Sequence, residues 1–133
     1  MLPRQARMTR PADFRRTVRR GRRAGRAALT GHLLVTDAPL SADGVGLDGV
    51  RSAEPAKVGF VVSRAVGTAV VRNRVKRRLR VVMREHLGML PAGSLFVVRA
   101  NPAAASARQV DLAADLDLVL ERLLRRQVGA LHR

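Results

Sequence analysis

Cationic side chains cluster in one segment of the chain, residues 67–84, which has the sequence GTAVVRNRVKRRLRVVMR. Wound at 3.6 residues per turn, the segment places four apolar residues on one stripe: Val71, Val75, Leu79 and Val82. The opposite arc carries polar side chains: Arg72, Asn73, Lys76, Arg77, Arg80 and Arg84. Guanidinium groups suit bidentate contact with phosphate, and Glu85 is the only acid between residues 56 and 99. The segment therefore predicts an amphipathic helix that packs one face on a core and presents the other to a nucleic acid.

The net charge of the chain is strongly positive. Lys and Arg number 26 against 10 Asp and Glu, which gives +16. Residues 1–36 and 56–99 each carry a net +9, and an acidic, glycine-rich segment at 37–55 with net −3 separates them. A surplus of this size repels itself unless an anion is bound, so it indicates a nucleic-acid or anionic-membrane partner.

The sequence favours RNA over duplex DNA as that partner. It shows no helix-turn-helix spacing, zinc module or basic zipper. It also has no Trp or Tyr and only three Phe, so base stacking must be sparse. Contacts with the backbone phosphates should therefore dominate, and affinity should fall steeply as salt rises.

Groups that could catalyse a reaction are scarce. The chain has no Cys, and His32, His86 and His132 lie far apart without the spacing of metal ligands. Four acids near the C-terminus, Asp111, Asp115, Asp117 and Glu121, are typical of a solvated helix face. No phosphate-binding glycine loop is present. We therefore expect neither catalytic residues nor a metal site in the polypeptide.

Hydropathy argues against a membrane protein. No apolar run approaches the roughly 20 residues that a membrane span needs. The N-terminal arginines are not followed by the apolar core of a signal peptide. Together with the absence of cysteine, this predicts a cytoplasmic protein without a membrane partner.

Periodicity and breaker residues predict an α+β domain. Residues 11–20 form a helix whose narrow apolar stripe is Phe14 and Val18, and the basic helix covers 68–87. Strands are expected at 27–35, 57–63 and 94–99, and a loop at 37–55. A strand, helix and strand in succession, as at 57–99, normally mean two parallel strands, so we expect a mixed sheet with helices mainly on one face.

The last helix is expected to begin with a capping box formed by Ser106 and Gln109 and to end near residue 127. Its core face consists of Leu112, Leu116, Val119, Leu120, Leu123 and Leu124. The whole predicts a single RNA-binding domain at 11–128, with a flexible basic tail at 1–10 and a C-terminal tail at 129–133.

Residues 63–80, SRAVGTAVVRNRVKRRLR, resemble the signature of the bacterial ribonuclease P protein component. The similarity extends along most of the chain. PADFRRTVRRG at 11–21 is similar to the N-terminal helix of that family, KVGFVVS at 57–63 to its central strand, and LFVVRANPAA at 95–104 to the strand and turn before its last helix. The RNR context is highly specific.

The resemblance implies an αβββαβα order and a four-stranded mixed sheet with a left-handed βαβ crossover, an arrangement known from a ribosomal-protein domain. It also implies a function, that of the protein subunit of an endoribonuclease that removes the 5′ leader from precursor tRNA. In that family the RNA subunit is the catalyst, and Mg²⁺ is expected to be held mainly by this RNA and the substrate. The implied partners are the catalytic RNA and precursor tRNA, with no obligatory protein partner.

Site residues follow from the same resemblance. Those expected to bind RNA are Arg72, Asn73, Arg74, Lys76, Arg77 and Arg80. Those expected to form a cleft for the single-stranded leader are Phe14, Phe60, Asn73, Lys76 and Arg80. The chain departs from many relatives in lacking an aromatic residue at Val18 and near His32 or Leu34, which leaves fewer rings for stacking.

Two other classes of function fit parts of the pattern. A structural RNA-binding protein of ribosomal type, without an associated reaction, would have a similar composition. A cationic domain that binds membrane surfaces would share the charge, but two good strands and three amphipathic faces favour a globular core.

Overall fold

The computed structural model describes residues 2–35 and 55–131. Nearly all of the loop expected at 37–55 thus lies outside the described residues. The main elements are α1 (Pro11–Arg20), β1 (Arg22–Gly25), β2 (Leu29–Leu34), β3 (Lys57–Val61), α4 (Ala69–His86), β4 (Leu95–Ala100) and α5 (Gln109–Leu131). Short 3-10 turns lie at Arg4–Ala6, Arg64–Val66, Leu87–Met89 and Pro102–Ser106. The αβββαβα order is confirmed.

The four strands form one mixed sheet in the order β1-β2-β4-β3. β1 pairs with β2 and β2 with β4 in antiparallel fashion, whereas β3 and β4 are parallel and α4 connects them. The residue pattern alone did not predict β1, because its sequence RRAG is cationic and lacks branched or aromatic side chains. Only the family resemblance implied this fourth strand.

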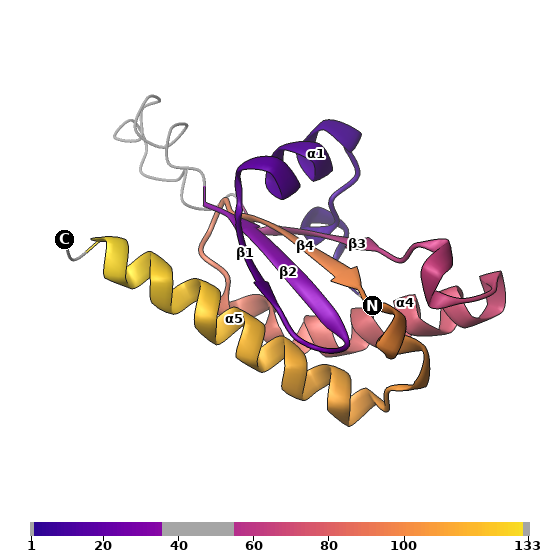
Figure 1. The fold of residues 1–133 in the computed structure, drawn as a ribbon. Coiled ribbons are helices and arrows are strands. Elements are labelled where there is room, and N and C mark those ends of the chain that lie inside the picture. The colour runs from indigo at the N-terminus through magenta and orange to yellow at the C-terminus, as the bar shows by residue number, and fades with distance from the viewer. Residues whose placement is uncertain (1, 36–54, 132–133) are drawn as a thin grey trace.

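The helices cover both faces of the sheet (Figure 1). α4 and α5 pack together on one face, and α1 lies across the other. The main core fills the first face with residues such as Leu29, Leu79 and Phe96, all at most 1% exposed. A smaller cluster of Met8, Leu95 and Val97 lies under α1. β4 is therefore buried on both faces, as expected of an inner strand of a sheet that has helices packed on each side.

The last helix packs closely on the sheet because β2 carries a glycine at the crossing. A Cβ atom on Gly31 would lie only 2.6 Å from Cγ1 of Val119. The predicted core face is confirmed, since Leu112, Leu116, Val119, Leu120 and Leu123 are buried and Leu124 is half-buried.

The predicted start of that helix is wrong. Ser106 ends a 3-10 turn that begins at Pro102, so it cannot cap α5. Instead, the backbone N–H of Arg108 donates to the carboxylate of Asp111 at 3.2 Å. Hydrogen bonds from the Arg108 side chain and backbone lower the pKa of Asp111 below its usual value.

Two acids of α5, Asp115 and Asp117, make tertiary contacts, contrary to the prediction that the acids of this helix form only a solvated face. Asp115 accepts a hydrogen bond from the backbone N–H of Ala28 at 3.0 Å and ties α5 to the sheet. Asp117 lies 2.5 Å from Nε2 of His86, whose Nδ1 is 2.8 Å from the carbonyl of Val82. The buried imidazole therefore joins α4 to α5.

The two predicted tails also differ from the structure. Leu2, Ala6 and Met8 are buried, and the N–H of Met8 donates to the carbonyl of Val58 on β3 at 2.9 Å. Three apolar side chains spaced among arginines are enough to dock this segment, although their pattern is too sparse to predict an element. At the other end, α5 continues through Leu131, past the start expected for the C-terminal tail.

Candidate nucleic-acid interface

The basic helix begins at a well-defined turn. Gly67 has a φ of 155°, a conformation that favours glycine, and the hydroxyl of the following Thr68 accepts a hydrogen bond from the N–H of Val71 at 3.3 Å. α4 then runs for 18 residues with Val75, Leu79 and Val82 buried in the core and Val71 packed against it. The predicted phase of the helix is confirmed.

This phase leaves most of the predicted RNA-binding side chains on the surface. Asn73, Arg74, Arg77 and Arg80 are exposed, and Lys76 is half-buried. Arg72 is also half-buried, and its Nε donates to the carbonyl of Gly67 at 3.2 Å. Arg72 therefore holds the turn before the helix, so the exposed side chains are better placed for an external phosphate.

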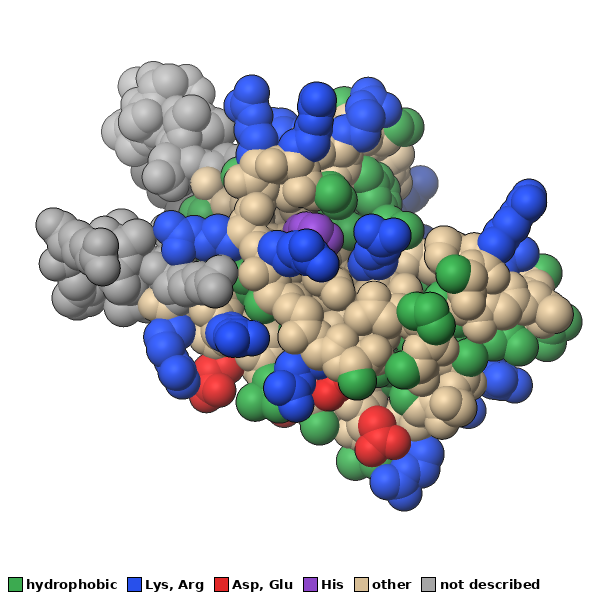
Figure 2. Space-filling view, in the orientation of Figure 1, with side chains coloured by type: hydrophobic (Ala, Val, Ile, Leu, Met, Phe, Trp, Pro, Cys, Tyr) green, Lys and Arg blue, Asp and Glu red, His purple; other side chains and the backbone are tan. Residues whose placement is uncertain are grey.

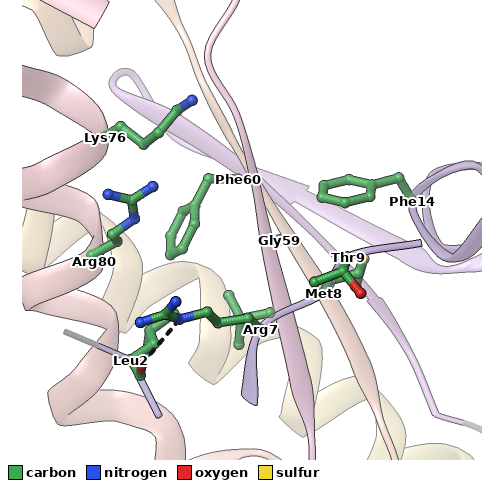
Figure 3. A pocket seen from close by; sticks show the side chains of 10 residues that line it. Leu2, Arg7, Met8, Thr9, Phe14, Gly59, Phe60, Lys76 and Arg80 are labelled. Carbon is green, nitrogen blue, oxygen red and sulfur yellow. Dashed lines mark hydrogen bonds between the residues drawn. The ribbon is translucent and has the colours of Figure 1, made fainter. Parts of the chain in front are cut away.

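A hollow of about 300 Å³ opens between α4, the edge strand β3 and the N-terminal segment (Figure 3). We call it the edge hollow; its lining residues are Leu2, Arg7, Met8, Thr9, Phe14, Val58, Gly59, Phe60, Lys76 and Arg80. Four of the five residues expected in a leader cleft line it, and Asn73 does not. Sequence reasoning missed the N-terminal side of this hollow, because residues 1–10 had been expected to form a free tail.

The two aromatic rings lie on opposite sides of β3 (Figure 3). Phe60 points toward Lys76 and Arg80, whereas Phe14 reaches the strand from α1. The Phe14 ring covers Gly59 so closely that a Cβ atom there would lie 2.4 Å from it. Phe14 and Phe60 therefore do not form one continuous stacking surface, and Phe60 is the ring next to the cations.

A second hollow, of about 490 Å³, lies on the α1 face of the sheet. We call it the histidine hollow; its lining residues are Val18, Arg23, Thr30, His32, Ser63, Ala65, Arg99, Ala100, Asn101 and Pro102. Val18, expected to pack in the stripe of α1, is 42% exposed here, and Thr17 is the buried residue of that helix. The alternation of Thr30 and His32 along β2 indicates that their side chains share one face of the sheet. Arg23 could not be placed on that face from the sequence, because β1 is not predicted from the residue pattern.

His32 is the unusual group of this hollow. The side chain is buried, and its Nδ1 has no hydrogen-bond partner. Burial lowers the pKa of His32 below its ordinary value of 6.5, and the charges of Arg23 and Arg99 lower it further. Burial and the two neighbouring cations therefore both favour the neutral imidazole.

This environment predicts a pH-dependent contribution to stability. Because the pKa of His32 is depressed in the folded state, the unfolded chain binds the proton more readily. The contribution is fully present above pH 6.5 and is lost as the pH falls through the folded-state pKa. We expect His32→Gln to change less in its free energy of unfolding than the wild type between about pH 8 and about pH 5.

Urea denaturation at a series of pH values measures this difference. All other titratable groups are present in both proteins, so the difference between the two profiles reports on His32. Parallel pH profiles for the two proteins would contradict the environment described for His32.

Charge is distributed unevenly over the surface (Figure 2). Lys and Arg side chains gather over α1 and the middle of the face shown, and acidic side chains lie along α5. The arginines of α1, Arg15, Arg16, Arg19 and Arg20, are all exposed. Arg7, Lys76 and Arg80 line the edge hollow and Arg23 and Arg99 line the histidine hollow, whereas neither described lining includes an Asp or Glu.

Metal ligands do not converge in the part of the chain that the structure describes. No group of three His, Asp or Glu side chains there could hold an ion. Within residues 2–35 and 55–131, no helix is long and apolar enough to cross a membrane.

Comparison with known proteins supports the resemblance seen in the sequence. The family model of Ribonuclease P matches residues 2–124. The ribonuclease P protein component of Streptomyces avermitilis is 53% identical over 124 residues, covering 93% of this chain and 96% of that protein. The component from a Nocardioides species is 50% identical over 123 residues, covering 92% and 95%.

Solved structures show the same fold. The RNase P protein of Staphylococcus aureus superposes with a TM-score of 0.68 at 22% identity, covering 87% of this chain and 93% of that one. The RNase P protein of Thermotoga maritima gives a TM-score of 0.66 at 21% identity, covering 87% and 96%.

Proposed function

Because this chain belongs to the ribonuclease P protein family, we propose that it binds the catalytic RNA of ribonuclease P and the 5′ leader of precursor tRNA. It thereby promotes the endonucleolytic removal of the leader in tRNA maturation, in the cytoplasm. The observation that carries the proposal is the cationic arc of α4 beside the edge hollow, in which Lys76 and Arg80 lie next to Phe60.

The exposed arc of α4 is suited to the catalytic RNA. Asn73, Arg74 and Arg77 project from a helix whose other face is fixed in the core, so their position does not depend on a mobile loop. A folded RNA presents irregularly spaced phosphates, and a rigid row of guanidinium groups can contact several of them.

The edge hollow and the histidine hollow are suited to a single strand. In the edge hollow a base can stack on Phe60 while its phosphates contact Lys76 and Arg80. α1 also leads to the histidine hollow, since Phe14 lines the first hollow and Val18, one turn later, lines the second. A leader a few nucleotides long could therefore follow this helix.

The chemistry of cleavage belongs to the RNA in this proposal. Asp111, Asp115 and Asp117 interact with Arg108, Ala28 and His86, respectively, so these three carboxylates do not form a common site for Mg²⁺. Mg²⁺ bound by the RNA and substrate would supply the activated water and stabilise the leaving oxygen. The polypeptide binds and orients the two RNAs.

Reconstitution tests the function directly. The chain is mixed with a bacterial ribonuclease P RNA and a precursor tRNA labelled at its 5′ end, at a Mg²⁺ concentration where the RNA alone is slow. We expect the protein to stimulate release of the leader, and the protein without the RNA to release none. Binding of the RNA without stimulation at any protein ratio would favour the structural, ribosomal-type alternative.

Phe14→Ala should separate substrate binding from packing. Because Phe14 is half-buried over Gly59, its loss should lower the free energy of unfolding by about 2 kcal/mol. If the leader also stacks on this ring, affinity for precursor tRNA should fall by a further 1 to 3 kcal/mol, roughly the value of one base. Affinity for mature tRNA should barely change.

Holoenzyme affinities for precursor and mature tRNA, measured with the melting temperature of the protein, decide between these roles. Equal losses for both substrates, or a lower melting temperature without any change in affinity, would remove Phe14 from the leader site.

A further inference from the structure

The N-terminal segment, residues 2–9, is part of the folded domain. Leu2, Ala6 and Met8 are 3%, 5% and 6% exposed. β3 is an edge strand, and Arg7 forms a parallel bridge with Val58 at its outer side. The N–H of Met8 donates to the carbonyl of the same Val58 at 2.9 Å. The segment therefore covers part of an edge that would otherwise be unpaired.

Arg7 lies where this segment meets the edge hollow. Its Nε donates to the carbonyl of Leu2 at 3.2 Å, which restrains the side chain (Figure 3). In the same view, Arg80 and Lys76 extend from α4 to the side of β3 on which Phe60 lies. All four side chains line the edge hollow, so cations from two separate segments converge near one aromatic ring.

The charge of the edge hollow is one-sided. Arg7, Lys76 and Arg80 line it, and among the described residues no Asp or Glu does. Like charges brought together in a partly enclosed space repel one another, so an anion that enters is attracted by all three. A phosphodiester supplies that anion, and an attached base can stack on the neighbouring ring.

We propose that the N-terminal segment forms one wall of the RNA site, with Arg7 binding a phosphate of a single-stranded RNA whose base stacks on Phe60. The inference rests on the proposed function, because it assumes that the edge hollow receives RNA. It adds Arg7, a binding residue outside the basic helix, and gives a role to the N-terminal segment, which the sequence pattern alone predicts to be a basic tail.

The absence of Trp and Tyr from the chain allows a direct measurement. Phe60→Trp places a single indole fluorophore in the edge hollow. Titration with a single-stranded RNA of about eight nucleotides should quench its emission as a base stacks on it. In this background Arg7→Ala is compared with Arg4→Ala, which removes the same charge from an exposed residue of the same segment that does not line the hollow.

We expect Arg7→Ala to weaken RNA binding about tenfold and Arg4→Ala to change it less than about twofold. The slope of log affinity against log salt should fall by about 0.7 for Arg7→Ala, the value for one phosphate contact with a single strand. Arg7→Gln keeps an N–H donor for the Leu2 carbonyl but lacks the charge, so the same loss in this variant excludes undocking of the segment as the cause.

Two results would overturn the inference. Equal effects of Arg7→Ala and Arg4→Ala, while Lys76→Ala still weakens binding, would remove Arg7 from the site and leave the proposed function intact. Absence of quenching in Phe60→Trp, while the anisotropy of a labelled RNA still reports binding, would show that RNA does not enter the edge hollow, and the role of Arg7 would fail with it. In that second case reconstituted cleavage still tests the function separately.

Discussion

Val75→Asp is expected to unfold the domain. Val75 is fully buried between α4 and the sheet, and no Lys or Arg is buried among the residues that the structure describes, so a carboxylate there would lack a buried cationic partner. Burying an unpaired charge should cost about 4 kcal/mol or more, a large part of the stability of a domain of this size. Urea denaturation followed by circular dichroism measures the loss.

Arg74→Ala is the matched control, because it lies one residue away on the exposed side of the same helix. Its free energy of unfolding should stay within about 0.5 kcal/mol of the wild type. An intact Val75→Asp protein, or an unfolded Arg74→Ala protein, would mean that the helix faces the core with a different side.

The second large effect is expected in RNA binding. Arg74 and Arg77 are both exposed on α4 and make none of the intramolecular contacts that occupy Arg72 and Arg78. The double variant Arg74→Ala/Arg77→Ala should reduce the slope of log affinity against log salt by about 2, one for each lost phosphate contact. Affinity for ribonuclease P RNA should fall at least tenfold at low salt, measured by filter binding across a salt series.

Arg122→Ala/Arg125→Ala removes the same charge from α5, where both arginines are exposed. This control should lower affinity only slightly, through the weaker overall field of the protein. If the two double variants lost affinity equally, RNA binding would depend on net charge alone, and the arc of α4 would have no special role.

The helices α1 and α4 are predictable because their sequence signals are local. Pro11 begins α1 at its first position, and apolar residues spaced three and four apart fix the buried face of α4. The last helix shows the limit of such reasoning. Ser106 and Gln109 have the spacing of a capping box, but Ser106 is the last residue of the 3-10 turn that begins at Pro102 and is therefore not the N-cap of α5.

Elements stabilised by distant partners escape local reasoning. The residues of β1 have little strand propensity, and this strand exists because its backbone pairs with β2. The N-terminal segment is stabilised in the same way by Val58, about fifty positions along the chain. In both cases tertiary contacts outweigh local sequence preference.

The candidate site was predictable to the extent that one helix and a family signature describe it. Phe60, Lys76 and Arg80 of the predicted cleft line one hollow and Asn73 does not, while Arg7 joins them through the docked segment. A lone histidine such as His32 has no ligand spacing that would mark it as functional in the sequence. Its neighbours Arg23 and Arg99 come from two other strands, so only the assembled sheet brings the three together.

The position of β4 in the sheet has a consequence for synthesis of the protein. β4 is the last strand of the chain to be made, yet it lies between β2 and β3. On the ribosome, β1 and β2 can pair as a hairpin early and the N-terminal segment can bridge β3 at Val58, but β3 gains its strand partner in the sheet only when residues 95–100 emerge. Such long-range pairing is slow to form, so the apolar face of α4 remains exposed to solvent until β4 has joined the sheet. A nascent chain that ends before β4 should therefore be open to chaperones and proteases, and the proposed RNA-binding surface should form only in the final stage of folding.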